Sequence, residues 1–393
     1  MKIALVIPSP PAYSETFFRS KIEGLKESGH EVILVTAKSK TDFDLCEHKT
    51  HPKVYANSFL QVIAMLWVGI RLLPYLKQVK TYYQLEKQEK TSWKRIVEKI
   101  YMNATLLKLD IDWLHFGFAT MTIERELVAK SIEAKMAVSF RGYDINVFPL
   151  KNPNVYNRLW KYVDKVHSIS QYLVEKGYAL GLSKDVPLQI ITPAVNSKLL
   201  KATSAKKTTT KLLLLTIARL HYIKGVDLLL ETAKILKDAK VDFLWQVIGG
   251  GSIADEERYH YHRYELELNK EVQFLGKLSH TETLEMVKKA DLYVQPSLNE
   301  GFCNAILEAQ AIGKLSIAFA VGGIPENIQE GETGFLVKKL DAQALASKIQ
   351  EISFLNFEKK EKISQQGQKR VKNSFSLQQQ KVDFNRFYTE DIS

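Results

Sequence analysis

The residues best suited to chemistry lie together in segment 299–313, where Glu300 and Glu308 stand eight positions apart. An apolar run before this segment predicts a buried strand, and Asn304 and Gly313 are predicted to begin and end a helix. The free amides at a helix N-terminus attract anions, phosphate above all. Carboxylates beside those amides can accept hydrogen bonds from sugar hydroxyls. The segment therefore suits a nucleotide-sugar, which combines phosphate with sugar hydroxyls on both sides.

Two glutamates at this spacing also occur by chance, so the surrounding sequence has to decide. That sequence resembles the donor-binding signature of retaining glycosyltransferases of the GT-B architecture, glycosyltransferase family 4 (group 1), in particular exopolysaccharide and colanic-acid-type members. The resemblance covers about residues 211–340. Its blocks follow the order of the family: Ala218-Arg219-Leu220, Lys224-Gly225, Ile248-Gly249-Gly250-Gly251, Phe274-Leu275-Gly276, Gly322-Gly323-Ile324-Pro325-Glu326 and Gly331-Glu332-Thr333-Gly334-Phe335-Leu336-Val337.

The resemblance also implies roles for individual residues. Arg219 and Lys224 would hold the donor diphosphate, Glu300 the hydroxyls of the donor sugar, and Glu308 the ribose hydroxyls. The glycine turn at Gly250 and the carboxylate of Glu326 would belong to the same donor site. Phosphate contacts would come from the backbone amides of Gly301, Phe302, Cys303 and Asn304. Cys303 can instead be taken for a nucleophile, but no histidine or other base motif adjoins it.

The acceptor side has fewer matches. His115 ends a predicted strand and resembles a recurring histidine of the active cleft, although a structural histidine fits the position equally well. Arg141 stands where the family usually has the histidine of a His-Gly-x-Asp block, and a cation there can meet the diphosphate or an acceptor carboxylate. The segment 8–18 lacks the glycine pair of many members and resembles the Ser-Glu-Thr-Phe variant of exopolysaccharide-type members.

Alternating strand and helix patterns predict an α/β fold with parallel, doubly wound sheets. Polar, unpatterned residues at 201–210 are the best candidate for a linker. The resemblance implies two Rossmann-like domains that face each other across a cleft: an acceptor domain at 1–200 and a nucleotide-sugar domain at 201–369, with 370–393 packing back on the first. The expected strands are 2–7, 31–36, 112–115, 136–140, 165–169, 188–191, 211–217, 243–248, 272–275, 291–295, 315–319 and 335–337.

The composition is typical of a two-domain globular protein: 393 residues, 45% of them hydrophobic and 25% charged. Two cysteines fit a reducing compartment and no signal peptide is recognisable, so a cytoplasmic location is expected, with peripheral contact at the inner face of the membrane as a further possibility. A net charge of +11 is compatible with nucleic acid, an anionic membrane or anionic small substrates. No nucleic-acid motif accompanies the charge, so nucleic acid is not expected as a partner.

Segment 59–101 interrupts the alternation. It begins with an apolar run that contains Gln61, Arg71 and Pro74, too interrupted to predict a membrane span. Basic and aromatic residues then mix at helical spacing, which is typical of a helix lying on an anionic membrane surface. An ordinary helical pair with a solvated lysine face explains the same pattern, and the sequence leaves both interpretations open.

These observations together predict a retaining, metal-independent hexosyltransferase with no cofactor besides its substrates. It would move a sugar from a nucleotide-sugar, with UDP favoured, to a saccharide or a polyprenyl-linked acceptor in surface polysaccharide biosynthesis. Three alternatives stay open: a non-catalytic nucleotide-sugar-binding subunit of a larger enzyme, a GT-B phosphorylase and a GT-B epimerase. The sequence does not decide the sugar, the linkage or the oligomeric state.

Overall fold

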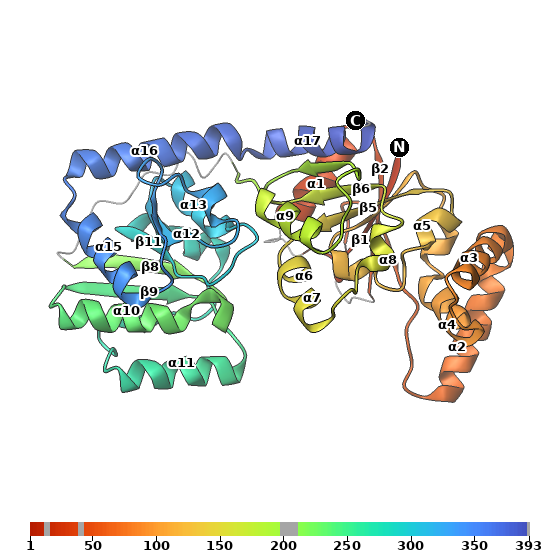
Figure 1. The fold of residues 1–393 in the computed structure, drawn as a ribbon, viewed down its shortest axis with the longest axis horizontal. Coiled ribbons are helices and arrows are strands. Elements are labelled where there is room, and N and C mark those ends of the chain that lie inside the picture. The colour runs from red at the N-terminus through yellow and green to blue at the C-terminus, as the bar shows by residue number, and fades with distance from the viewer. Residues whose placement is uncertain (12–15, 38–42, 197–210, 391–393) are drawn as a thin grey trace. The chain divides into compact units, whose positions relative to one another are not determined.

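The structure is a computed structural model that describes residues 1–11, 16–37, 43–196 and 211–390. Contacts divide the chain into two compact units (Figure 1): unit 1 is Met1–Ile191 with Lys381–Ser393, and unit 2 is Thr192–Gln380. The predicted boundary at residue 200 and the predicted linker at 201–210 lie outside the described residues. So does the centre of the motif at 8–18.

Unit 1 is built on a seven-stranded sheet in the order β3-β2-β1-β4-β5-β6-β7. All neighbouring strands pair in parallel. Of the strands in this sheet, the sequence analysis missed only β3. This short strand lies at the edge of the sheet and is polar, so it has no apolar run to reveal it. The strands are β1 (Lys2–Val6), β2 (Glu31–Thr36), β3 (Glu47–Thr50), β4 (Trp113–Phe116), β5 (Lys135–Phe140), β6 (Lys165–Ser168) and β7 (Leu188–Ile190).

Helices cover both faces of this sheet, which is why β1 is apolar along nearly its whole length. The helical elements are α1 (Thr16–Glu27), α2 (Ser58–Leu72), η1 (Leu73–Tyr75), α3 (Leu76–Gln88), α4 (Trp93–Asn103), η2 (Leu106–Lys108), η3 (Ala119–Thr122), α5 (Val128–Ser131), α6 (Tyr143–Asn146), α7 (Phe148–Lys151), α8 (Asn157–Trp160), α9 (Gln171–Ala179) and the end of α17 (Leu377–Thr389). Phe384 and Phe387 of α17 are fully buried in the same core cluster as Ile3 of β1. The last helix thus completes the core of unit 1.

Segment 59–101 forms α2, α3 and α4, which lie together beside the sheet of unit 1 (Figure 1). Pro74 does not end the helix, because it sits at the start of the short 3-10 turn η1, where a proline nitrogen needs no hydrogen bond. The helical run Ser58–Gln88 is therefore 31 residues long, and by length and composition alone it is apolar enough to cross a membrane. Gln61, Arg71 and Pro74 therefore do not break the helical run, and the expectation that it does not span a membrane stays a prediction.

Unit 2 repeats the plan with a six-stranded parallel sheet in the order β10-β9-β8-β11-β12-β13. Its strands are β8 (Leu212–Ile217), β9 (Phe243–Ile248), β10 (Val272–Phe274), β11 (Leu292–Gln295), β12 (Leu315–Phe319) and β13 (Phe335–Val337). Its helices are η5 (Tyr222–Lys224), α10 (Val226–Asp238), α11 (Ile253–Glu265), α12 (His280–Lys289), α13 (Asn304–Ala311), α14 (Ile324–Asn327), α15 (Ala342–Phe354) and α16 (Phe357–Ser374). Each of these strands lies within one residue of its predicted bounds.

Candidate functional site

The candidate donor site lies at the carboxyl ends of β8 and β11. These strands are neighbours in the sheet, and the chain builds the sheet outward in opposite directions from them. In doubly wound sheets this switch point leaves a crevice between the loops that follow the two strands. Arg219 and Lys224 follow β8, and Glu300 follows β11, so the topology brings the three predicted residues to one place.

Gly225 allows the loops that follow β8 and β11 to pack closely against each other. Gly225 adopts a left-handed conformation with φ +68°, and a Cβ there would lie 1.8 Å from the carbonyl oxygen of Pro296. The amide of Leu298 also donates to the carbonyl of Ile223 at 2.8 Å. Backbone packs directly on backbone at this point, which places Lys224 beside the loop that follows β11.

The centre of the site is an ion pair between Lys224 and Glu300. Lys224 Nζ lies 2.5 Å from Glu300 Oε1, and Ser297 Oγ donates to the same oxygen at 2.8 Å. Gln295 Nε2 in turn donates to Ser297 Oγ at 2.8 Å. The side chains of Lys224 and Glu300 are 23% and 11% exposed. The hydrogen bond from Ser297 therefore holds the Glu300 carboxylate in place, while the side chains of Lys224 and Glu300 both remain partly exposed to solvent.

The glycine pair Gly322-Gly323 supports the same loop from the other side. Gly322 has φ +56°, and a Cβ there would lie 2.1 Å from the carbonyl oxygen of Glu300. The amide of Gly323 donates to that oxygen at 2.8 Å. The sequence identified this pair as a motif without a role, and the structure shows that it fixes the backbone of Glu300.

The N-terminus of α13 differs from the prediction. Cys303, not Asn304, is the N-cap residue, with extended backbone angles and no side-chain cap, and Asn304 is the first helical residue. The amide of Cys303 donates to Asn327 Oδ1 at 3.0 Å, and Asn327 Nδ2 donates back to the Cys303 carbonyl at 3.2 Å. The buried Asn327 thus shapes the turn, so Asn304 has no need to cap it. The Cys303 amide therefore has a partner within the protein. Phosphate contacts by the amides of Gly301, Phe302 and Asn304 stay a prediction.

Cys303 is a core residue. Burial, and then the nearby carboxylate of Glu300, raise the pKa of its thiol to about 12. Its side chain belongs to a buried apolar cluster with Ile306 and Ala309. A protonated, buried thiol is a poor nucleophile, which agrees with the interpretation that Cys303 takes no covalent part.

Glu308 lies one turn into α13 and has a partner that the sequence did not suggest. His280 Nε2, from the first residue of α12, lies 3.1 Å from Glu308 Oε1. The hydrogen bond to this carboxylate raises the pKa of His280 above its ordinary value. Nothing in the local sequence pairs two residues 28 positions apart. The contact arises only because the starts of α12 and α13 lie near each other at the end of the sheet.

The predicted glycine turn follows β9 as expected. Gly249 has φ +135°, and a Cβ there would lie 2.0 Å from the carbonyl oxygen of Ala218. The next backbone contact, from the Leu220 amide to the Gly250 carbonyl at 3.0 Å, keeps this turn beside the loop that carries Arg219. The Arg219 side chain is exposed there. Among the residues that the structure describes it has no ion-pair partner.

Glu326 is the third residue of the helical turn α14 and is half-buried. Arg370 of α16 donates to its backbone carbonyl at 2.7 Å and to that of Asn327 at 2.6 Å. These contacts fix the backbone of the turn. They do not assign a task to the Glu326 carboxylate.

The two predicted residues of unit 1 lie in different surroundings. His115 is fully buried: Tyr388 of α17 contacts its Nδ1 at 2.6 Å, and Ser139 Oγ contacts its Nε2 at 2.8 Å. Burial, followed by the charge of Lys21, lowers the pKa of His115 well below its ordinary range. This position favours the structural role that the sequence had left open over a contact with substrate. Arg141 stacks its guanidinium 3.8 Å from the ring centre of Phe17 and is half-buried.

Part of the chain is similar to a known protein family. The family described as "Glycosyl transferases group 1" matches residues 199–370, which include the entire β8–β11 site. Most of unit 2 is therefore similar to that family. Arg219, Lys224, Gly250, Glu300 and Glu308 all lie inside the matched residues, whereas His115 and Arg141 lie outside them.

Full-length likeness extends beyond the matched residues. A Salmonella typhimurium protein, WcaL, provisionally assigned as a colanic acid biosynthesis glycosyltransferase, is 25% identical over 96% of this chain and 97% of its own. The amylovoran biosynthesis glycosyltransferase AmsK of Erwinia amylovora is 28% identical over 62% of this chain and 61% of its own.

Solved structures give the fold. Sucrose-phosphate synthase from Thermosynechococcus elongatus has a TM-score of 0.73 at 19% identity, over 99% of this chain and 98% of that one. Anabaena Alr3699/HepE, solved in complex with UDP and glucose, has a TM-score of 0.72 at 15% identity over the whole of both chains. Units 1 and 2 are thus two Rossmann-like α/β domains, as in these structures of the GT-B fold.

Proposed function

We propose that this protein transfers a sugar, with retention of anomeric configuration, from a nucleotide-sugar to a saccharide or lipid-linked saccharide. The observation that carries the proposal is the Lys224–Glu300 ion pair beside the uncapped N-terminus of α13. It places a cation, a carboxylate and free amides at one switch point. Those are the groups that a diphosphate attached to a sugar requires.

Donor binding would rearrange this pair. Without donor, Lys224 and Glu300 satisfy each other at 2.5 Å. An entering diphosphate offers Lys224 a more strongly charged partner, and Arg219 is exposed at the other end of the same loop. Glu300 is then released to accept hydrogen bonds from the sugar. Lys224 would thus couple the arrival of phosphate to the readiness of the carboxylate.

The chemical step needs no protein nucleophile. The bond from the anomeric carbon to the diphosphate oxygen breaks while a bond to the acceptor hydroxyl forms on the same face. The acceptor proton passes to the departing phosphate oxygen, and the negative charge on the diphosphate is stabilised by Lys224, Arg219 and the amides at the start of α13. Because these cations belong to the chain, we propose that transfer proceeds without a metal ion.

The choice of substrates rests on the relatives. WcaL and AmsK are named for colanic acid and amylovoran biosynthesis, and Anabaena Alr3699/HepE was solved with UDP and glucose. We therefore propose a UDP-sugar as donor and a growing surface polysaccharide as acceptor, with the reaction in the cytoplasm.

The test measures thermal stabilisation by UDP-, GDP- and ADP-sugars in the presence of EDTA, followed by transfer with the selected donor. At about 100 times Kd, a donor should stabilise the protein by about 2.7 kcal/mol. Glu300→Gln should keep a donor-dependent shift and lose transfer. No shift with any donor, or unchanged transfer by Glu300→Gln, would contradict the proposal. Release of sugar phosphate when orthophosphate is supplied would indicate a phosphorylase instead.

A further inference from the structure

An extended apolar surface on α2 has no cover within the part of the chain that the structure describes. Phe59, Leu66 and Ile70 are 73%, 65% and 59% exposed, although each is a large hydrophobic side chain. Leu72 is the only residue of α2 that is buried. Contiguous apolar surface of this kind marks an interaction site. The α2 patch consists of Phe59, Leu60, Val62, Ile63, Leu66, Trp67, Ile70, Leu73 and Leu76.

The patch is one continuous face of a well-formed helix. Its members recur three and four positions apart, a spacing that places them on one side. The less exposed residues Gln61, Met65 and Leu72 follow the same spacing on the side turned toward the protein. Asn57 caps the helix by accepting hydrogen bonds from the amides of Phe59 and Leu60. The exposed face is therefore presented by a stable element.

The segment that carries the patch is basic, although two of its lysines are paired, Lys49 with Glu47 at 3.1 Å and Lys77 with Glu133 at 2.7 Å. No aspartate or glutamate occurs from His48 to Leu85, a stretch that contains Lys49, Lys53, Arg71, Lys77 and Lys80. At the edge of the patch, the Arg71 guanidinium lies 4.7 Å from the ring centre of Trp67. Tryptophan, with an apolar body and a polar edge, and arginine, with an apolar stem, both suit the boundary between lipid headgroups and acyl chains.

We propose that the α2 patch docks on the surface of an anionic phospholipid bilayer. The apolar face would enter the region between headgroups and acyl chains, and the basic residues would meet the lipid phosphates. Each basic residue near such a surface adds about 1 kcal/mol. Lys53, Arg71 and Lys80 form no ion pair among the described residues. Their charge favours this occupant over a second copy of the chain, because two copies of the patch would bring these basic residues together.

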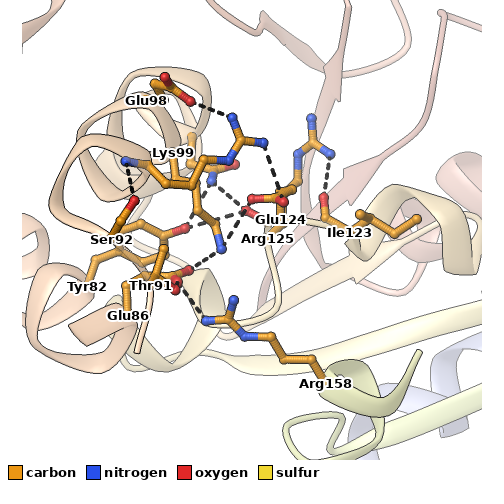
Figure 2. A network of polar contacts seen from close by, with 12 residues as sticks. Tyr82, Glu86, Thr91, Ser92, Glu98, Lys99, Ile123, Glu124, Arg125 and Arg158 are labelled. Atoms are coloured by element: carbon orange, nitrogen blue, oxygen red, sulfur yellow. Dashed lines mark hydrogen bonds and ion pairs between the residues drawn. The ribbon is translucent and has the colours of Figure 1, made fainter. Parts of the chain in front are cut away.

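The structure also indicates that α2 lies along the membrane surface. The other half of the continuous helix, α3, is fixed in the protein by a buried network (Figure 2). Glu86 of α3 forms an ion pair with Lys99 of α4 at 2.6 Å and accepts a hydrogen bond from Arg158 at 2.7 Å. The Glu86 and Lys99 side chains are no more than 2% exposed. Only α2 is left for lipid. Its 15 residues span about 22 Å, less than the ~30 Å of a hydrocarbon core.

The experiment uses the full chain and vesicles of phosphatidylcholine with or without about 30 mol% phosphatidylglycerol. Co-sedimentation measures binding, and a blue shift of tryptophan fluorescence reports burial of the exposed tryptophans, Trp67 of the patch and Trp93 of α4. The test variant is Leu66→Glu/Ile70→Glu, which changes two exposed side chains and leaves the core intact. The matched control is Phe354→Glu/Phe357→Glu, because these residues of unit 2 are 87% and 77% exposed and the charge change is the same.

Wild type and control should bind anionic vesicles, and the test variant should bind at least about tenfold more weakly. Absence of binding by wild type, or equal binding by the test variant, would overturn the proposal. It would also be overturned if wild type were a dimer that the test variant dissolves, with no vesicle binding, since the occupant would then be a second copy. Extraction of wild type from membranes only by detergent would indicate a spanning helix instead. The docking proposal is independent of the proposed function. Wild type, test variant and control should all be stabilised equally by a nucleotide-sugar, so a loss of vesicle binding can be told apart from a loss of donor binding.

Discussion

Lys224 Nζ and Glu300 Oε1 lie 2.5 Å apart although 76 positions separate the two residues in the sequence. One side chain suits a diphosphate and the other suits a sugar, so the pair occupies both halves of a nucleotide-sugar site before the ligand arrives. Their mutual neutralisation keeps two partly buried charges satisfied in the empty site. Exchange of partners on donor binding would therefore leave neither charge unpaired.

Lys224→Ala should weaken donor binding about 10- to 100-fold, because a charge-assisted contact to the diphosphate is lost. Calorimetric titration or a thermal shift with the selected nucleotide-sugar measures the effect. The matched control is Lys234→Ala, which removes a lysine that is also paired at 2.5 Å, with Asp238, on the surface of α10. Equal weakening by both variants would show that general charge, and not this site, governs binding.

Gly225→Ala should destabilise the protein far more than Gly276→Ala. The two glycines have nearly the same angle, φ +68° and +67°, so the backbone strain is the same, about 1–2 kcal/mol. At Gly276 a Cβ would meet nothing within 4 Å, whereas at Gly225 it would lie 1.8 Å from the Pro296 carbonyl. We expect the Gly225 variant to cost more than about 3 kcal/mol in urea unfolding and to weaken donor binding. Similar costs for both would refute the close approach of the two loops.

Glu86→Gln should cost about 3 kcal/mol at neutral pH, because Lys99 would lose a fully buried counter-charge. Burial opposes ionisation of Glu86, but hydrogen bonds from Lys99, Arg158 and Thr91 outweigh it and lower its pKa. A lowered folded pKa means that this stabilisation is complete above the ordinary glutamate pKa of about 4.3 and is lost as pH falls through the folded value.

Urea unfolding of wild type and Glu86→Gln between about pH 7 and pH 3 measures this difference. The control is Glu98→Gln, because Glu98 is paired with Arg95 at 2.5 Å but is 54% exposed and should contribute less than about 1 kcal/mol. If the free energies of unfolding of wild type and Glu86→Gln still differed at the lowest pH, the packing of the Glu86 side chain, and not its charge, would account for the stabilisation.

His280→Ala should destabilise donor-free protein at acid pH and have little effect at alkaline pH. The pKa of His280 is raised by its hydrogen bond to Glu308. A raised folded pKa makes the stabilisation complete below the ordinary histidine pKa of about 6.5 and lost as pH rises through the folded value. Thermal unfolding from about pH 6 to pH 9 follows this change. Glu308→Gln should show the same trend, and a constant difference across this range would argue against the ion pair.

The sequence by itself determined every described strand except β3, and the residue types of the site, because both follow from local sequence patterns. Apolar runs bounded by turn residues gave each strand of unit 2 within one residue, since a parallel strand covered on both faces must be apolar along its length. Gly225, Gly249 and Gly322 stood out as motif glycines for a related reason: a left-handed backbone in close contact with another backbone excludes every other residue.

Only the tertiary structure decided how these residues are used. The His280–Glu308 contact, the Asn327 contacts that move the N-cap to Cys303, and the buried surroundings of His115 all join distant parts of the chain. The exposure of the α2 patch was also decided only by the tertiary structure. An apolar helix has the same sequence pattern whether or not other parts of the protein cover it. Such outcomes depend on which elements the fold brings side by side, and the periodicity of one element carries no information about its neighbour.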